Sequence, residues 1–236
     1  MSYLDASSGN VVSQASADER VGFIRKTYTH LALSIAAFAL LETFLQKMGF
    51  GEKAMALLAG SSWSWLIVLG VFMVVSIVAD KWARDDYSPA LQYAGLGLYI
   101  VAEAFIFLPL LYMAQAIAPG VIENAAILTL GLVAGITAVA FTTRKDFSFL
   151  APALTIGGII AMGVIVASIA FGFQLGMFFS AAMIIFAAGS ILYSTSNIIH
   201  VYRADQHVAA SLSLLASVGL LFWYVIQFMM SFMGDD

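Results

Sequence analysis

The chain has 236 residues, of which 62% are hydrophobic and only 10% are charged, and its formal net charge is -4. An average soluble domain has about 25% charged residues, so this composition places the chain among integral membrane proteins. The low charge and the lack of a Lys- and Arg-rich block exclude an electrostatic nucleic-acid surface. The chain has no cysteine, which excludes disulfides and thiolate metal sites.

Residues 1–26 hold many small polar and charged side chains and few large apolar ones. Such a segment buries too little apolar surface to offset its ordering entropy. We therefore expect a mobile tail over residues 1–26, followed by a membrane domain over residues 27–236.

Seven long apolar segments follow the tail. Each has roughly the 17–25 residues that an α-helix needs to cross about 30 Å of hydrocarbon. Unpaired backbone groups are costly in lipid, and the segments lack the alternation of barrel strands. The sequence therefore predicts an all-α integral membrane protein, a bundle of seven transmembrane helices over residues 28–45, 63–79, 91–113, 125–141, 149–171, 177–199 and 208–232.

The positions of the ten Lys and Arg residues predict the orientation of the bundle. With seven helices, only Lys47 and Lys53 fall on one side of the membrane, and the others fall on the opposite side. Cytoplasmic loops carry an excess of Lys and Arg. We therefore expect a cytoplasmic N-terminus and a periplasmic or extracellular C-terminus.

Catalytic and cofactor motifs are not found in the sequence. It has no H-E-x-x-H pair, no G-x-S-x-G elbow and no phosphate-binding loop ending in Lys. The three histidines, His30, His200 and His207, are widely separated at expected helix ends and make no firm metal site. We expect neither an enzyme nor a cofactor.

Two acidic residues lie within predicted spans. Glu103 is almost central in the span over residues 91–113, where an ionised acid costs about 2.5–3.5 kcal/mol on insertion scales. It should therefore face the protein interior, either as an ion or proton site or as a neutral acid joining two helices. Glu42 lies nearer the end of its span, where water access lowers this cost.

Two motifs give the sequence a family resemblance. The loop between the fourth and fifth spans contains Thr142, Thr143, Arg144, Lys145 and Asp146, and the sixth span ends Tyr-Ser-Thr-Ser-Asn-Ile-Ile-His with Ser194, Thr195 and Asn197. In this order and on a seven-helix plan they resemble the transmembrane Bax-inhibitor-motif family, most closely its YccA-like branch of bacterial inner-membrane proteins. The resemblance extends from Arg25-Lys-Thr-Tyr28 through the last span.

The resemblance implies a bundle around a central last helix and, in some members, a pH-sensitive calcium leak gated by two acidic residues. Here the corresponding positions are Ser194 and, counting without a gap, Ala216, and neither can titrate. Ser194, Thr195 and Asn197 can still line a polar path. The resemblance also implies an association with a membrane-anchored ATP-dependent protease of the FtsH type.

Two functions therefore stay open for a multi-pass protein of the bacterial inner membrane. The first is regulation of such a protease in membrane stress or protein quality control, with the tail as the segment that is engaged. The second is a passive calcium or proton conduit that uses Glu103 and the polar end of the sixth helix. Calcium usually takes six to eight oxygen ligands, so a single buried Glu supports it only weakly.

Overall fold

The computed structural model describes residues 11–143 and 145–233. In this part of the chain, a short 3-10 helix, η1 (Val12–Gln14), precedes eight α-helices. Seven of them are long and apolar enough to cross a membrane, as predicted. Their order along the chain is α1 (Ala17–Lys47), α2 (Phe50–Ala59), α3 (Ser62–Ala83), α4 (Pro89–Ile117), α5 (Val121–Thr143), α6 (Leu150–Phe171), α7 (Met177–His200) and α8 (His207–Met233).

The first helix begins eleven residues earlier than the predicted span. Ser16 and Glu19 form a capping box, in which Ser16 Oγ accepts from Glu19 N–H at 3.3 Å and Glu19 Oε2 accepts from Ser16 N–H at 3.1 Å. These bonds satisfy backbone donors that a new helix leaves unpaired. The expected mobile tail is therefore helical from Ala17 onward. Residues 1–10 of that tail lie outside the described residues.

A short helix that the hydropathy pattern did not predict, α2, follows α1. After α1 ends, Gly49 adopts φ 76°, a left-handed conformation that favours glycine, and the chain turns directly into α2. This helix has 10 residues, too few to cross a bilayer. It connects the end of α1 to the start of α3.

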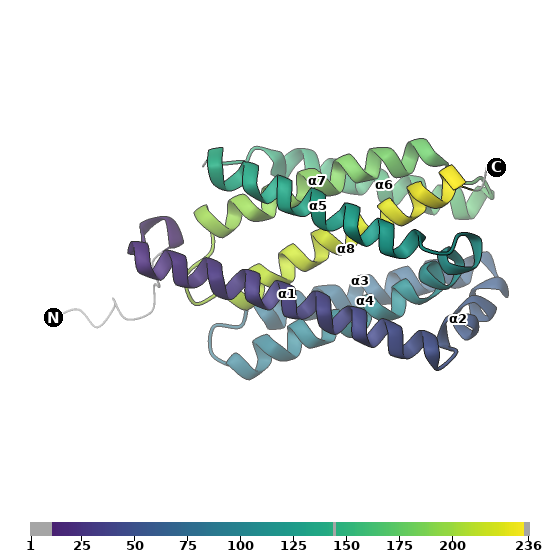
Figure 1. The fold of residues 1–236 in the computed structure, drawn as a ribbon, viewed down its shortest axis with the longest axis horizontal. Helices are drawn as coiled ribbons and strands as arrows, with labels where there is room; N and C mark the ends of the chain where they lie inside the picture. Colours follow the sequence, from purple (N-terminus) through teal and green to yellow (C-terminus); the bar gives the residue numbers. More distant parts are fainter. Residues whose placement is uncertain (1–10, 144, 234–236) are drawn as a thin grey trace.

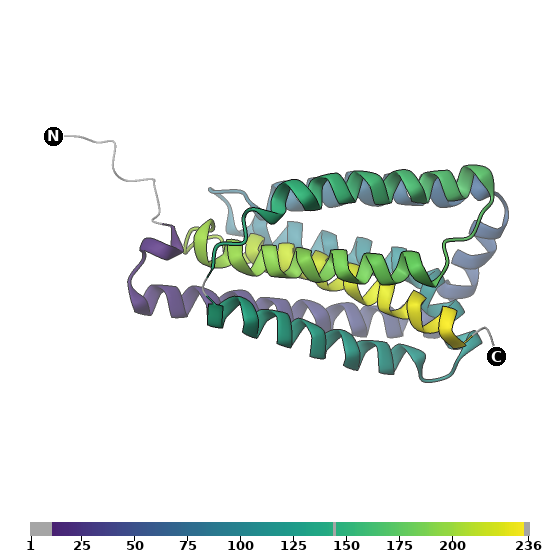
Figure 2. The same cartoon turned by 90° about the horizontal axis from the view of Figure 1, so that it is seen from above.

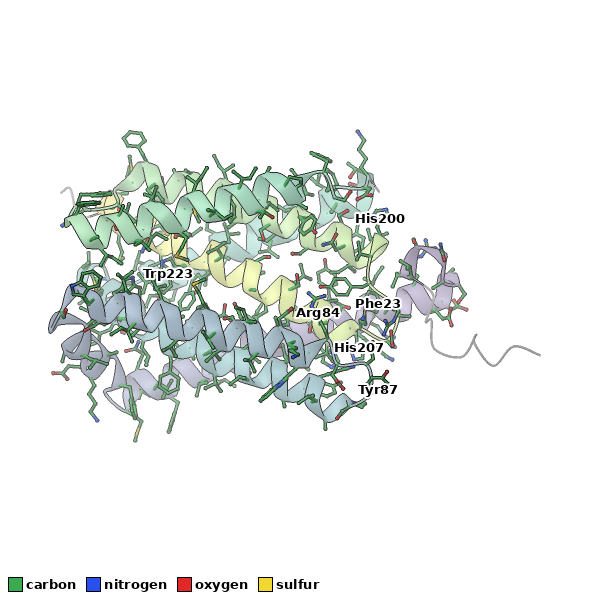
Figure 3. All side chains as sticks on the ribbon, turned by 180° about the vertical axis from the view of Figure 1, so that it is seen from behind. Phe23, Arg84, Tyr87, His200, His207 and Trp223 are labelled. Atoms are coloured by element: carbon green, nitrogen blue, oxygen red, sulfur yellow. The ribbon has the colours of Figure 1, made fainter. Side chains whose placement is uncertain are left out.

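The seven long helices alternate in direction, as Figures 1 and 2 show. One end of the bundle holds the start of α1, the end of α3 and the α7–α8 loop, together with Arg84 and Arg203; we call it the basic end. Figure 3 shows Arg84, Tyr87, His200 and His207 gathered there. The opposite end, which holds α2, is called the α2 end. Because the helices alternate, Lys47 and Lys53 lie at the α2 end, and the other described Lys and Arg residues lie at the basic end, as predicted.

The last helix lies in the centre of the bundle, as the resemblance implies. α8 packs against α1, α3, α4, α5 and α7, and together with α4 it is buried along most of its length. The other five spans leave most of their length exposed on the outside of the bundle. Because apolar exteriors suit hydrocarbon, this distribution fits a bundle surrounded by lipid.

At the basic end, the chain before α1 is held against the α7–α8 loop. Val12 is fully buried in a cluster with Phe23, Tyr202 and Val208, and its N–H donates to Tyr202 O at 2.9 Å. Val11 pairs with Arg203 in an isolated antiparallel bridge. These contacts connect the start of the chain to the start of the central helix.

We predict that Gly95→Ala destabilises the bundle by about 1–3 kcal/mol, because overpacking a helix contact forces the backbones apart. A Cβ at Gly95 on α4 would lie 2.5 Å from Ala79 O and 2.7 Å from Ala83 N on α3. Gly97→Ala, on the same helix with nothing within 4 Å, is the matched control and should be neutral or stabilising. Thermal unfolding of both variants in detergent measures the difference, and equal stabilities would contradict the prediction.

Candidate functional site

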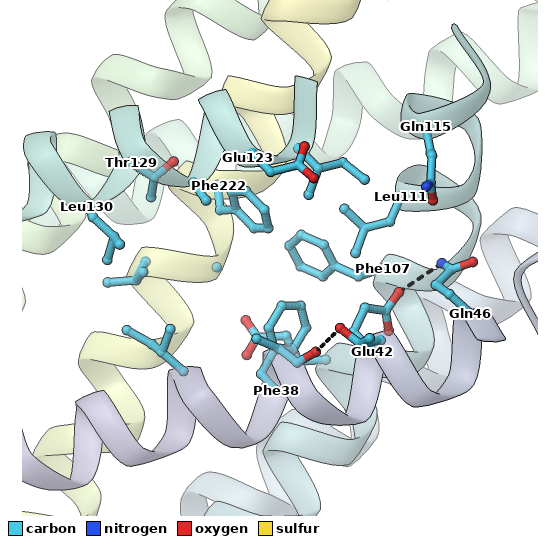
Figure 4. A pocket seen from close by; sticks show the side chains of 18 of the residues that line it. Phe38, Glu42, Gln46, Phe107, Leu111, Gln115, Glu123, Thr129, Leu130 and Phe222 are labelled. Carbon is cyan, nitrogen blue, oxygen red and sulfur yellow. Dashed lines mark hydrogen bonds between the residues drawn. The ribbon is translucent and has the colours of Figure 1, made fainter. Parts of the chain in front are cut away.

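A cavity of about 810 Å³ lies between α1, α4, α5 and α8. We call it the Glu103 cavity. It extends from the α2 end, where Gln115 and Glu123 line it, to the middle of the bundle, where Glu103 and Leu215 line it. Figure 4 shows Phe38, Glu42 and Gln46 entering from α1, opposite Glu123, Thr129 and Leu130 on α5. The cavity thus reaches from one end of the bundle to the depth of its central acid.

Glu103 is buried at the inner end of this cavity, as predicted. It is 3% exposed, and its Oε2 makes no hydrogen bond within the described part of the chain. The carboxylate lies against the backbone of α8, since a Cβ at Gly219 would be 1.8 Å from Glu103 Oε1. The absence of a side chain at Gly219 creates the space for this acid.

Glu42 is also buried, contrary to the expectation that water access would relieve it. It is 4% exposed, and its Oε1 accepts from Gln46 Nε2 at 3.1 Å. The same amide donates to Leu108 O on α4 at 3.0 Å, one residue before Pro109. Glu42 Oε2 has no hydrogen-bond partner among the described residues. The cavity therefore holds two buried carboxyl groups, each with a free acceptor oxygen.

A second cavity, of about 650 Å³, lies between α3, α4, α6, α7 and α8. We call it the serine cavity. It extends from Asp80 near the basic end to Tyr99 and Ser190 in the middle of the bundle. Four hydroxyls connect α7 and α8 along it: Ser190 to Ser217 at 3.0 Å, Ser217 to Ser194 at 3.3 Å, and Ser194 to Ser213 at 3.2 Å.

Ser194 on α7 is hydrogen-bonded to two serines of α8 in the serine cavity. Ala216 lines the serine cavity, but it is Ser217, one position later, whose hydroxyl meets Ser194. Ser213 Oγ also lies 3.2 Å from Ser194 Oγ. The α8 residues beside Ser194 are therefore an alanine and two serines, none of which can titrate as a carboxyl group does.

The other two polar residues of the α7 motif do not line either cavity. Thr195 is fully buried on α7, and its hydroxyl has no partner among the described residues. Asn197 is half-buried, and its backbone carbonyl accepts from Val201 and Tyr202 N–H at the end of α7. Of this motif, Tyr193 and Ser194 line the serine cavity.

The α5–α6 loop motif makes local structural contacts. Thr142 and Thr143 donate to carbonyls one turn earlier on α5, each at 2.7 Å. Asp146 accepts from Ser148 N–H at 2.8 Å, and this bond holds the pKa of the Asp146 carboxyl below its ordinary value. Phe147 N–H donates to Ser196 Oγ at 2.9 Å, which fastens the loop to α7. Lys145 is exposed, and Arg144 lies outside the described residues.

The two cavities approach each other at one place. Tyr99 lines the serine cavity, and Glu103, one helical turn further along α4, lines the Glu103 cavity. On α8, Ser217 lines the serine cavity, and Gly219, about 200° further round the helix, lines the Glu103 cavity. The two cavities therefore lie on different faces of α8, and Glu103 rests on this helix where they approach each other.

The possible metal-binding side chains of the protein do not form a cluster in the described part of the chain. Over residues 11–143 and 145–233, no set of three or more His, Cys, Asp and Glu side chains is placed to hold a metal ion. His30 and His207 lie together at the basic end, with ring centroids 4.9 Å apart. His30 Nε2 is 3.0 Å from Tyr93 Oη, which connects α1 to α4.

Sequence comparison finds a family model and several relatives that match most of the chain. The family model described as the inhibitor of apoptosis-promoting Bax1 matches residues 20–234. The chain belongs to the Bax inhibitor family. Among its relatives, an uncharacterized protein of Pseudomonas aeruginosa is 28% identical over 91% of each chain. Protein LIFEGUARD 4 of Arabidopsis thaliana is 32% identical over 86% of this chain and 82% of its own length.

Family membership covers the whole helical bundle. The match includes all seven spans and the α2 helix, so the two cavities lie entirely within the Bax inhibitor region. An uncharacterized protein of Neisseria meningitidis matches over a similar extent, at 26% identity over 90% of this chain and 92% of its own. The protein is thus a multi-pass Bax inhibitor family protein with relatives in bacteria and in a plant.

We predict that Gly219→Ala displaces the Glu103 carboxylate and destabilises the protein by about 1–3 kcal/mol. Because the colliding atom is the end of a flexible side chain, the fold should survive. In a Glu103→Ala background the added methyl group meets no carboxylate, so this cost should largely disappear. A double-mutant cycle of unfolding free energies in detergent measures the coupling.

The matched control for this cycle is Gly131→Ala on α5, which has nothing within 4 Å of an added Cβ. Its effect should be the same in both backgrounds. Additive effects of Gly219→Ala and Glu103→Ala would show that the carboxylate does not rest on α8.

Proposed function

We propose that this Bax inhibitor family protein is a passive conduit for protons or calcium, closed at the contact between Glu103 and α8. The observation that supports the proposal most directly is the pair of cavities that approach the same turn of α4 from opposite ends of the bundle. A path that is closed at one contact between two cavities would have this form.

The chemistry along this route favours protons over calcium. At the barrier there is one carboxyl group, Glu103, and beyond it the hydroxyl series of Ser190, Ser217, Ser194 and Ser213. Carboxyl and hydroxyl groups both donate and accept protons, so they can relay them. A calcium ion usually takes six to eight oxygen ligands, several of them anionic, and the described barrier offers fewer.

Conduction requires the Glu103 contact to open. In this proposal, movement of α4 relative to α8 joins the two cavities near Tyr99 and Glu103, which are neighbours on α4. With the orientation that the Lys and Arg distribution favours, the Glu103 cavity faces the periplasm and the serine cavity faces the cytoplasm.

We predict that Glu103→Gln lowers proton flux into liposomes to the level of empty liposomes, because glutamine cannot take up and release a proton. Flux would be followed with an entrapped pH dye, and calcium flux in parallel with a calcium dye, between about pH 5 and pH 8. Glu52→Gln, on α2 and outside both cavities, is the matched control and should conduct like the wild type.

Two outcomes would contradict this proposal. Wild-type flux no greater than that of empty liposomes at every pH would exclude a conduit. Undiminished proton flux through the Glu103→Gln variant would exclude Glu103 as the proton-carrying group. Calcium flux without proton flux would mean that the conducted ion is calcium.

A second candidate function is regulation of a membrane-anchored ATP-dependent protease of the FtsH type. The feature that favours it is the length of α1: its 31 residues span about 46 Å, well beyond the hydrocarbon thickness of about 30 Å. The start of α1 and η1 project beyond the other helices at the basic end, as Figure 1 shows. This polar projection offers a surface to a soluble protease domain.

We predict that deletion of residues 2–10 abolishes engagement by such a protease, because these residues belong to the predicted tail that it would engage, and leaves flux unchanged. This deletion keeps Val12 and the capping box of Ser16 and Glu19, which stabilise the basic end. Deletion of residues 2–18 removes them as well and should also lower the unfolding temperature. Copurification with the protease, degradation rate and thermal unfolding are the measurements. Unchanged engagement after the shorter deletion would contradict a role for the terminus.

A further inference from the structure

The Glu103 cavity is much larger than a proton or a metal ion requires. Its volume of about 810 Å³ falls within the range of about 300–1,000 Å³ that is typical of cavities for small organic molecules. A narrow file of water would suffice for conduction. A cavity of this size can therefore hold a small organic molecule.

Aromatic rings form the wall of the cavity nearest to its acids. Phe107 on α4 is buried between Phe38 on α1, at a ring-centroid distance of 5.2 Å, and Phe222 on α8, at 5.7 Å. All three line the cavity, and Figure 4 shows Phe38 and Phe107 beside Glu42. The faces of such rings attract cations as well as apolar groups.

The charged groups of the cavity are mainly acidic. Three carboxyl groups line it, Glu42, Glu103 and Glu123, against one exposed amine, Lys47. Glu42 and Glu103 are both more than nine-tenths buried, and each has an oxygen without a hydrogen-bond partner in the described chain. A buried acceptor without a partner destabilises the protein, and a cationic ligand would remove that cost.

The cavity is flanked by two helices that face the lipid. α1 packs mainly against α4 and α8, and α5 mainly against α7 and α8, so α1 and α5 stand on either side of the cavity with α8 behind it. The residues that line the cavity include two small ones, Ala39 on α1, which is exposed, and Ala126 on α5, which is half-buried. A molecule dissolved in the bilayer can therefore enter from the side.

We propose that the Glu103 cavity binds an amphipathic organic cation, with its charge between Glu42 and Glu103 and its apolar body against Phe38, Phe107 and Phe222. Acids beside aromatic rings recognise this ligand class, because they stabilise a cation that an apolar cavity alone would exclude. The proposal uses the same site as the proposed conduit, but binding does not require conduction.

The test uses tetraphenylphosphonium, a lipophilic cation, and tetraphenylborate, an anion of the same shape. Binding is measured on the purified protein in lipid nanodiscs without an ion gradient, with empty nanodiscs subtracted. We expect saturable binding of the cation and none of the anion. Glu42→Gln and Glu103→Gln should each weaken cation binding at least about tenfold. Phe38→Leu should weaken it about two- to fivefold.

Control variants outside the cavity show whether a loss of binding is specific to the residues that line it. Glu52→Gln, an acid outside the cavity, should bind like the wild type. Ala39→Trp should block binding by filling the rim, whereas Ala37→Trp, two residues earlier on the same helix and not lining the cavity, should leave binding intact. Thermal unfolding of each variant verifies that its fold is retained.

The outcomes distinguish this proposal from the conduit. Equal binding of the cation and the anion, or unchanged cation binding in both glutamine variants, would overturn the ligand proposal. Binding with no flux above empty liposomes would support the ligand proposal and remove the conduit. Flux without cation binding would support the conduit and overturn the ligand proposal. Inhibition of wild-type flux by the cation would support a shared site.

Discussion

Close packing around α8 is the constraint on which the rest of the structure depends. In hydrocarbon, apolar side chains gain little by leaving lipid for the protein interior, so helices associate through close contact and hydrogen bonds. Small buried residues at the start of α8, Ala209, Ala210 and Ser211, allow its neighbours to approach. The hydroxyls of Ser213 and Ser217 join it to α7. The five helices around α8 are thus organised by one shared partner.

The two cavities follow from this central position. α8 and α4 fill the middle of the bundle, so the remaining space divides into the Glu103 cavity toward the α2 end and the serine cavity toward the basic end. Where the cavities approach each other, the Glu103 carboxylate rests on a residue without a side chain, Gly219. In the proposed conduit this contact closes the path, and a rotation of one side chain or a small shift of a helix would open it.

The α2-end half of the protein and its basic-end half differ in chemistry. The Glu103 cavity combines carboxyl groups with phenyl rings, and the serine cavity combines hydroxyls with Asp80 at its outer end. At the basic end, Arg203 pairs with Asp86 and Asp205, and Arg84 pairs with Asp80. Exposed ion pairs of this kind contribute little to stability. The buried contact of Val12 with the α7–α8 loop is therefore the stronger restraint on that end.

Several differences between prediction and structure have a local physical cause. The start of α1 was missed because the length of an apolar run was used to place the helix, although Ser16 and Glu19 already formed a capping-box pattern in the sequence. α2 was missed because it is too short to be a span. Burial of Glu42 was missed because its distance from the end of α1 gives depth but not direction.

The sequence by itself determined the seven spans and the interior position of Glu103, because length, hydropathy and the cost of a charge in lipid are local properties. The resemblance to the Bax inhibitor family came from two of its motifs, and the family model bears it out. Only the tertiary structure decided that Glu42 and Glu103 share one cavity, that Ser213 and Ser217 are the partners of Ser194, and that Gly219 accommodates the central acid. The reason is that a transmembrane helix is apolar around its whole circumference. Its hydropathy pattern therefore does not mark the face that packs inward, and the rotation of each helix is fixed only by contact with its neighbours.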